Sequence, residues 1–598
     1  MADAGACRAR LAALIVASLA PLWLVGIFGR QLWTPDEPRE ANIAWHMSQQ
    51  QDRTLPVLAG MPFLEKPPLS YWLSAAGITL FGDHASAARA PNLVYAVLTA
   101  VAVGALACAM GVTASAALLA ALVTGSAVIT FRVSSWLAPD AALLAGNALA
   151  LLGAWRGYSA APGAAKLSGY TLMHAGAALG FMAKSAPGWL VPALALGALI
   201  IWERRWQELR RPELYAGVLL QVLVIGPWLW LVLQAPAGAA ALRTLLWNNL
   251  VGRFAHLSAP AALDYARGHP NSPGKYLLEL PVYVAPWTLA AAAALACAWR
   301  RRGALPGTAV PWRFALAASL PWLALLSLAA TARDIYAAPA VLGFALLIAL
   351  WAQEAQQRPT RLDLWCVGGT VLLVALIGTA LLLALAVLAL AGAIPRAQAV
   401  IAGLVVAAPG AGLLLGARRA QRQRALCRAL GMSYASYALM LCVTALVAFP
   451  VIDRWQDLGA LARRIRQDTQ SHPLALLAPD ETTLAVIDHA FTTSGFRVLD
   501  STAAADLRAW FAAQGADARA LVLLPGHAPG DVSRWLARWH QLPDPGDGAA
   551  AALIDADAAR LVRRYELPQG RRYALLGPAA RASTSPPAEV ATHATLNP

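Results

Sequence analysis

Long apolar runs separated by short polar segments dominate the chain as far as residue 451. A helix of roughly 17 to 25 apolar residues can cross a bilayer, because it satisfies its own backbone hydrogen bonds where no water is present. The pattern therefore predicts an α-helical polytopic membrane core over residues 1–451. We predict thirteen spans, at residues 11–28, 86–109, 113–131, 137–155, 168–183, 186–202, 214–235, 278–299, 312–331, 335–352, 364–393, 398–417 and 433–451.

The pattern changes after the last predicted span. Short apolar runs at residues 474–478 and 520–524 flank a helix-like stretch at 503–513. This alternation predicts a small C-terminal α/β domain over residues 452–578. Residues 579–598 are rich in Ser, Thr, Pro and Ala, a composition that predicts a disordered tail.

The start of the chain resembles a membrane span more than a signal peptide. Arg8 and Arg10 precede the apolar residues 11–28. A cleaved signal peptide has a shorter apolar core and a cleavage site of small residues. We therefore expect the first span to remain uncleaved.

Composition and charge fix an orientation. Hydrophobic residues make up 59% of the chain and charged residues 13%, whereas soluble proteins carry about 25% charged residues. The net charge of +15 comes from arginine clusters in short loops, which follow the positive-inside rule and do not indicate nucleic-acid binding. With thirteen spans and a cytoplasmic N-terminus, these clusters are cytoplasmic, and the loops 29–84 and 236–277 and the C-terminal domain are periplasmic. An even number of spans would break this agreement.

Cysteine and nucleotide motifs change the picture little. The six cysteines include no C-x-x-C pair, so neither a disulfide framework nor a cysteine metal site is indicated. No Walker or G-x-G-x-x-G loop occurs, which argues against nucleotide chemistry. A divalent ion held by Asp, Glu or His stays open, because carboxylate sites have no spacing signature.

The loop 29–84 concentrates charge in a chain that has little. An acidic pair, Asp36 and Glu37, is followed by Arg39, and Glu65-Lys66-Pro67-Pro68-Leu69-x-Tyr71-Trp72 lies further along the same loop. Together these motifs resemble the bacterial aminoarabinose transferases of lipid A, which are relatives of the protein O-mannosyltransferases in the GT-C superfamily.

Weaker similarities to that family continue to about residue 345. They are Asp140 after Ala138-Pro139, Lys184 in Ala183-Lys184-Ser185, the stretch from Asn249 through His269 and Tyr276 to Trp287, and the segment from Arg333 through Tyr336 to Pro339. Ser185 stands where the family has glycine, and Arg333 stands where it has lysine.

The resemblance implies a GT-C glycosyltransferase of the bacterial inner membrane. It would move a sugar, such as 4-amino-4-deoxy-L-arabinose or glucosamine, from undecaprenyl phosphate to a lipid A phosphate at the periplasmic face. Direct displacement would invert the anomeric carbon, and no cofactor would be required.

Two readings of the loop residues remain open. Asp36 is placed to be a general base or to orient the acceptor, but it also precedes an amphipathic helix that it could cap. Lys66 and Arg39 would bind the donor phosphate. The alternative is that they only extend their charged ends to the membrane–water interface, as basic residues near a bilayer commonly do. Glu65 is a candidate for catalysis, for binding a sugar amine or a metal, or for a structural salt bridge.

The other candidates come from the resemblance. Asp140 at the end of a span is a catalytic candidate, with helix capping as the alternative. The resemblance implies donor-phosphate contacts for Arg333, Tyr336 and Lys184, and substrate contacts for His269, Tyr71 and Tyr276; interface anchoring is the alternative for Lys184 and Tyr336.

Three rival functions share parts of this pattern. An enzyme of the same fold could transfer a sugar to protein or to another glycan. A lipid or sugar-lipid flippase also has many spans, but transporters keep ionisable groups at mid-membrane, whereas here the charges fall in loops at one face. A membrane scaffold would not need Asp36.

Overall fold

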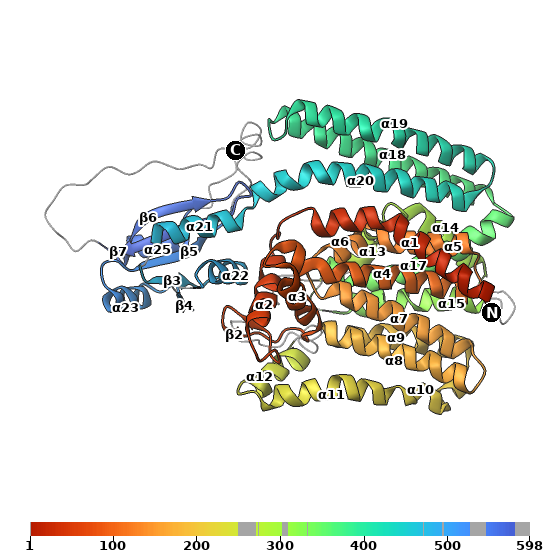
Figure 1. Ribbon diagram of the computed structural model, residues 1–598, viewed down its shortest axis with the longest axis horizontal. Helices are drawn as coiled ribbons and strands as arrows, with labels where there is room; N and C mark the ends of the chain where they lie inside the picture. The colour runs from red at the N-terminus through yellow and green to blue at the C-terminus, as the bar shows by residue number, and fades with distance from the viewer. Residues whose placement is uncertain are drawn as a thin grey trace. The chain divides into compact units, whose positions relative to one another are not determined.

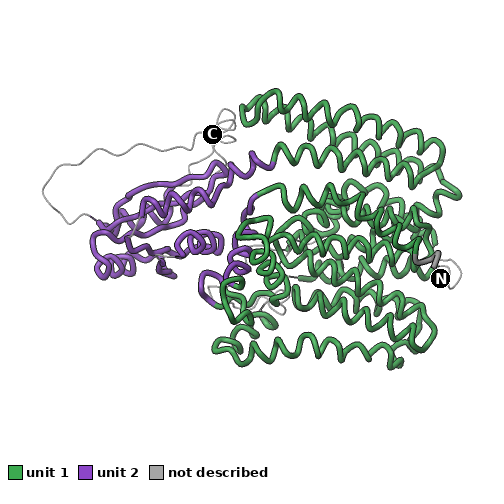
Figure 2. Tube along the Cα trace, in the orientation of Figure 1, with its two compact units in different colours: residues 1–30, 47–57, 62–448 green, residues 31–46, 58–61, 449–598 purple. Residues whose placement is uncertain are grey.

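The computed structural model describes residues 2–248, 271–272, 274–301, 309–329, 331, 333–469, 472–492, 495–526 and 546–579. They form two compact units (Figure 2). The first unit comprises residues 1–30, 47–57 and 62–448, and the second comprises residues 31–46, 58–61 and 449–598. The second unit therefore combines two segments of the loop 29–84 with the C-terminal domain. The predicted boundaries at 452 and 579 stay predictions, and the predicted tail from residue 580 lies outside the described residues.

The first unit is helical (Figure 1). Its long helices are α1 (Ala2–Phe28), α4 (Ala85–Ala109), α7 (Asp140–Ser159), α8 (Ala164–Lys184), α9 (Pro187–Glu203), α11 (Val218–Gln234), α17 (Ala338–Gln357), α18 (Arg361–Leu390), α19 (Arg396–Arg422) and most of α20 (Leu426–Trp455). Its shorter helices are α3 (Leu69–Phe81), α5 (Ala114–Ser126), α6 (Val128–Ser135), α10 (Pro212–Ala216), α12 (Gly238–Arg243), α13 (Lys275–Tyr283), α14 (Thr288–Arg300), α15 (Val310–Ala317) and α16 (Leu320–Ser327). Short turns of helix lie at η1 (Trp206–Arg210), η2 (Thr244–Asn248) and η6 (Asp334–Ala337). A two-stranded ribbon, β1 (Val57–Leu58) and β2 (Met61–Pro62), has its outer residues in the first unit and its inner residues in the second.

The structure confirms a polytopic membrane core, with fewer clear spans than predicted. Within the described part of the chain, eight helical segments are long and apolar enough to cross a membrane, or up to ten if each of two bent pairs makes one span. The eight are Ala6–Phe28, Ala85–Ala109, Pro212–Gln234, Val310–Ser327, Asp334–Gln357, Arg361–Leu390, Arg396–Arg422 and Leu426–Thr469.

The difference from thirteen has local causes. The predicted spans 113–131 and 278–299 are broken into α5 and α6, which meet at 64°, and α13 and α14, which meet at 117°. Three further predicted spans form α7, α8 and α9. Asn147 and His174 lower the mean hydropathy of α7 and α8, and α9 has 17 residues.

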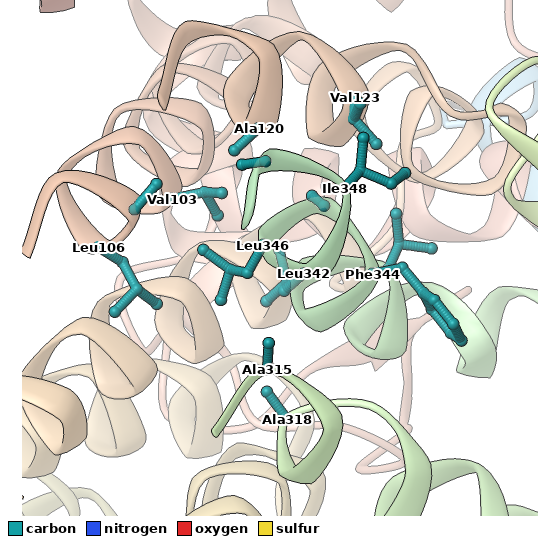
Figure 3. Close-up of a cluster of buried hydrophobic side chains, with 14 of the residues drawn as sticks. Val103, Leu106, Ala120, Val123, Ala315, Ala318, Leu342, Phe344, Leu346 and Ile348 are labelled. Atoms are coloured by element: carbon teal, nitrogen blue, oxygen red, sulfur yellow. The ribbon is translucent and has the colours of Figure 1, made fainter. Parts of the chain in front are cut away.

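Helix α17 forms the centre of the first unit. Leu342, Phe344, Leu346 and Ile348 of this helix are all buried, so it is apolar all round, as expected for a core helix. Figure 3 shows these side chains together with apolar side chains of α4, α5 and α15.

Small residues bring α7 and α8 into close contact. A Cβ atom added at Gly153 would lie 2.1 Å from the backbone nitrogen of Met173. Glycine at such positions lets membrane helices approach backbone to backbone. Because α7 and α8 run as a hairpin, the start of α7 and the end of α8 are brought to the same end of the pair.

The C-terminal part of the second unit contains a mixed five-stranded sheet, which confirms the predicted α/β character. The strand order is β4-β3-β5-β7-β6; β3 pairs in parallel with β4 and β5, and β7 pairs antiparallel with β5 and β6. The strands are β3 (Leu474–Leu477), β4 (Arg497–Leu499), β5 (Arg519–Leu524), β6 (Ala559–Glu566) and β7 (Arg572–Pro578). The helices are α21 (Leu458–Thr469), α22 (Glu481–Ala490), α23 (Ala504–Gln514) and α25 (Ala549–Asp555).

Alternating side chains along the strands build a core on each face of the sheet. Leu476 and Leu521 pack in one cluster with residues of α21 and α22. Leu477 and Val522 pack in a second cluster with residues of α23 and α25. This two-sided burial is the arrangement expected of parallel strands covered by helices.

Candidate active site

The acidic motif of the loop 29–84 lies at the start of α2 (Glu37–Gln49), as the sequence predicted. Glu37 is buried, and its carboxylate accepts a hydrogen bond from the backbone nitrogen of Trp33 at 2.8 Å. The backbone carbonyl of Asp36 accepts from Glu40 N at 3.1 Å, while Asp36 Oδ1 lies 3.4 Å from a terminal nitrogen of Arg39. The Asp36 side chain is therefore turned toward Arg39.

Arg39 is surrounded by carboxylates. It donates to Glu40 Oε1 at 2.7 Å and also to Glu481, and it forms the ion pair with Asp36. Its side chain is 7% exposed. One guanidinium therefore serves three acids, which is the environment of a group that holds carboxylates in place. Its predicted contact with the donor phosphate stays a prediction.

The face of α2 that carries Arg39 packs along α22 in the second unit. Asn42 donates to Asp488 at 2.8 Å and to the carbonyl of Ala485 at 3.3 Å, and His46 contacts Asp488 at 2.7 Å. Arg39, Asn42 and His46 recur at the spacing of one helix face. This row of contacts fixes α2, from Arg39 to His46, against α22 of the C-terminal domain.

The carboxylate of Asp488 is tuned by these contacts. Burial raises the pKa of Asp488, but the hydrogen bonds from His46 and Asn42, together with the electrostatic attraction of His46 and His489, hold the pKa below its usual value. The group is therefore ionised at neutral pH and available to both partners.

The second charged motif lies in the first unit. Lys66 Nζ is 3.9 Å from Glu65 Oε2, and both side chains are largely buried. The neighbouring Leu64 packs into a cluster with Phe181 of α8 and Trp228 of α11. This apolar anchor holds the Glu65-Lys66 pair just before α3 begins at Leu69.

Indole groups secure the segment that precedes this pair. Trp72 donates to the carbonyl of Arg53 at 2.7 Å, and Trp228 donates to the carbonyl of Thr54 at 3.1 Å. Phe63 N donates to the carbonyl of Pro56 at 2.8 Å, which closes the short ribbon. The segment is therefore held by hydrogen bonds as well as by packing.

Three of the predicted site residues meet at the end of the α7–α8 hairpin. Lys184, the last residue of α8, donates a hydrogen bond to Asp140, the first residue of α7. Its ammonium also lies 4.6 Å from the centre of the Tyr336 ring. Asp140 is thus an ion-pair partner, and Lys184 points inward to an acid and an aromatic face.

Tyr276 and Arg333 meet beside this group. The buried hydroxyl of Tyr276 donates to the backbone carbonyl of Arg333 at 3.1 Å, and Arg333 precedes the η6 turn that carries Tyr336. Tyr71 is buried on α3. His269 lies outside the described residues, as does the stretch from Asn249 to Phe254.

The residue that follows Lys184 has an unusual backbone. Ser185 has φ 63° and ψ −138°, a conformation that glycine adopts freely and serine does not. We expect Ser185→Gly to stabilise the protein by about 1 kcal/mol, because glycine removes the strain at that position. Chemical unfolding of the detergent-solubilised protein measures this change. Gly163, which already has φ 120°, is the matched control, since Gly163→Ser should destabilise.

That no cofactor is required stays a prediction, and a divalent ion held by Asp, Glu or His stays an open alternative. In the described parts of the chain there is no group of three or more His, Cys, Asp or Glu side chains arranged to hold a metal ion. Two acids that the structure brings to the site carry no motif in the sequence. Glu481 and Asp488 lie more than 400 positions from their partners on α2. Glu481 also has an ordinary explanation, because an acid in the first turn of a helix interacts favourably with the helix dipole.

The sequence is similar to one protein family and to individual glycosyltransferases of known name. The family described as dolichyl-phosphate-mannose-protein mannosyltransferase matches residues 65–231. An undecaprenyl phosphate-alpha-4-amino-4-deoxy-L-arabinose arabinosyl transferase of Serratia proteamaculans is 29% identical over 343 residues, 57% of this chain and 59% of that protein. The protein of the same name from Pseudomonas paraeruginosa is 30% identical over 335 residues, 56% of this chain and 58% of that protein. The match therefore spans about three fifths of these curated relatives.

The fold has a solved counterpart. The crystal structure of ArnT from Cupriavidus metallidurans bound to undecaprenyl phosphate matches with a TM-score of 0.65 and 19% identity, covering 96% of this chain and 99% of that chain. The apo structure of the same protein also matches with a TM-score of 0.65. The resemblance predicted from the loop 29–84 is thus confirmed, and this chain is a multi-pass membrane protein that is similar in sequence to the aminoarabinose transferases and has an ArnT-like fold.

Proposed function

We propose that this protein is a polyprenyl-phosphate-sugar-dependent glycosyltransferase. It transfers an amino sugar, with 4-amino-4-deoxy-L-arabinose as first choice, from undecaprenyl phosphate to a phosphate of lipid A. The observation that carries the proposal is the match to the mannosyltransferase family over residues 65–231, which contains Glu65, Lys66, Asp140 and Lys184. The similarity to the aminoarabinose transferases supports the choice of sugar and donor.

The chemistry divides among the predicted residues. Asp36 orients the acceptor or accepts its proton, and Lys66 and Arg333 neutralise the donor phosphate as negative charge develops on it. Because a lipid A phosphate is already ionised, orientation and charge screening contribute more than proton removal. Displacement by the acceptor oxygen at the anomeric carbon, with undecaprenyl phosphate leaving, inverts that carbon.

We also infer the topology predicted from charge. If α7, α8 and α9 cross the membrane along with the clearer spans, the count is thirteen and the arginine clusters are cytoplasmic. The loop 29–84 and the C-terminal domain are then periplasmic, in the inner membrane of a bacterium.

A protein acceptor is the second candidate, because the matching family is described as transferring mannose to protein. Purified protein in detergent, given undecaprenyl-phosphate aminoarabinose and lipid A, should yield lipid A with the added mass of the sugar by mass spectrometry. A flippase would yield no product without a bilayer. Transfer to a peptide but not to lipid A would replace the acceptor in this proposal.

A further inference from the structure

One contact in the second unit links the acidic motif to the C-terminal domain. Arg39, which pairs with Asp36, also donates a hydrogen bond to Glu481. Glu481 is the first residue of α22, which begins shortly after strand β3 ends. The guanidinium of Arg39 therefore connects the first residue of α22 to the carboxylate proposed for catalysis.

The position of Glu481 relative to the sheet, just beyond the carboxyl end of β3, is informative. In doubly wound sheets, ligands bind outside the carboxyl ends of the parallel strands, where successive connections run to opposite sides. Strand β3 lies at this point, since β4 pairs on one side of it and β5 on the other. Here the start of α22 contacts the loop 29–84: the hydroxyl of Thr482 donates to the carbonyl of Pro35 at 3.0 Å.

The turn that presents Glu481 is firmly held. Asp480 accepts from Thr483 N at 2.9 Å and caps α22. Arg571 binds Asp480 and also donates to Thr483 Oγ1 at 2.9 Å and to the Tyr573 hydroxyl at 2.6 Å. These hydrogen bonds fix the backbone from which the Glu481 side chain extends. An acid on a surface loop would have no such fixed backbone.

We propose that Glu481 is a positioning residue for the transfer reaction, and that through Arg39 it fixes the orientation of the Asp36 carboxylate. The inference rests on the proposed function of Asp36. It assigns the C-terminal domain a role in assembling the site, since Asn42 and His46 extend the same docking along α22. Small displacements of a reacting group reduce the reaction rate steeply. A contact from Glu481 through Arg39 that fixes the Asp36 carboxylate therefore increases the rate.

The test uses Glu481→Gln in the full-length protein. We expect kcat to fall about tenfold with KM nearly unchanged, because the reacting carboxylate is misplaced while the substrate contacts remain. Loss of a negative charge beside Arg39 also favours ionised Asp36, so the acidic limb of the rate profile should move to lower pH. Glu481→Asp, which keeps the charge, should leave that limb in place.

A double variant separates positioning from simple damage. If Glu481 acts only through Arg39, Glu481→Gln adds nothing to the loss caused by Arg39→Gln. Asp506→Asn, an exposed acid in the first turn of α23, is the matched control and should behave as wild type.

Two results would overturn the proposal while leaving the proposed function intact. The first is that Glu481→Gln has wild-type kinetics while Asp36→Asn is inactive. The second is that the losses of kcat caused by Glu481→Gln and Arg39→Gln multiply in the double variant. Full transfer by Asp36→Asn would overturn this proposal together with the catalytic role of Asp36, whereas the proposed transfer reaction itself would stand.

Discussion

Replacing Asp36 by Asn should lower the rate of sugar transfer by roughly 10²- to 10⁴-fold, the range typical of a lost acid–base group. Asn keeps the shape of the side chain but has no charge to pair with Arg39 and no basic oxygen for the acceptor. The loss should fall on kcat, since Asp36 acts on the acceptor as the bond forms. Conversion of lipid A by the purified protein, followed by mass spectrometry, measures it.

The matched control is Asp52→Asn in the same loop. Asp52 is exposed, and its carboxylate accepts from Thr54 N at 2.9 Å, a bond that the Asn side-chain oxygen can also accept. This variant should transfer sugar at the wild-type rate. Wild-type transfer by folded, well-expressed Asp36→Asn protein would contradict the catalytic role.

An effect near the lower end of that range would itself be informative. An ionised phosphate acceptor needs no base, so the remaining contribution of Asp36 would be orientation and electrostatic screening. An acceptor hydroxyl, as in protein or glycan, would need its proton removed and should show the larger loss.

The long helices could be predicted from the sequence because their apolar composition is uniform. The predicted span 86–109 appears as α4 (Ala85–Ala109), and the thirty-residue run 364–393 appears as α18 (Arg361–Leu390). The bends between α5 and α6 and between α13 and α14 could not be predicted from the sequence. An apolar run indicates that a segment is surrounded by apolar groups, but it does not indicate the direction in which the helix runs. Helix bends depend on packing partners that are distant in sequence.

The candidate site shows the same division. Asp140 and Lys184 could each be selected, but their ion pair joins residues 44 positions apart and depends on the close approach of α7 and α8. Glu481 could not be selected at all, because its significance comes from a partner 442 positions away. Motifs identify residues whose side chains are capable of catalysis or binding, and the fold determines which of these residues are in contact.

Lys184→Met should be the most destabilising of these substitutions, by about 3 to 5 kcal/mol, because it leaves the charge of Asp140 buried without its cation. The side chains of Asp140 and Lys184 are 6% and 12% exposed, so solvent can replace little of the lost interaction. Unfolding of the detergent-solubilised protein by denaturant, followed by tryptophan fluorescence, measures the loss.

The double variant Asp140→Asn/Lys184→Met distinguishes stability from function. Removing both charges should restore most of the lost stability, since no unpaired charge remains buried. If Lys184 also binds the donor phosphate, the restored protein should still transfer sugar poorly, with a raised KM for the donor. Arg301→Met is the control: its pair with Glu354 is about one-third exposed and should be worth less than about 1 kcal/mol. A double variant as unstable as Lys184→Met would show that the buried, unpaired charge of Asp140 does not cause the loss of stability. A stable and fully active double variant would show that the role of Lys184 is structural only.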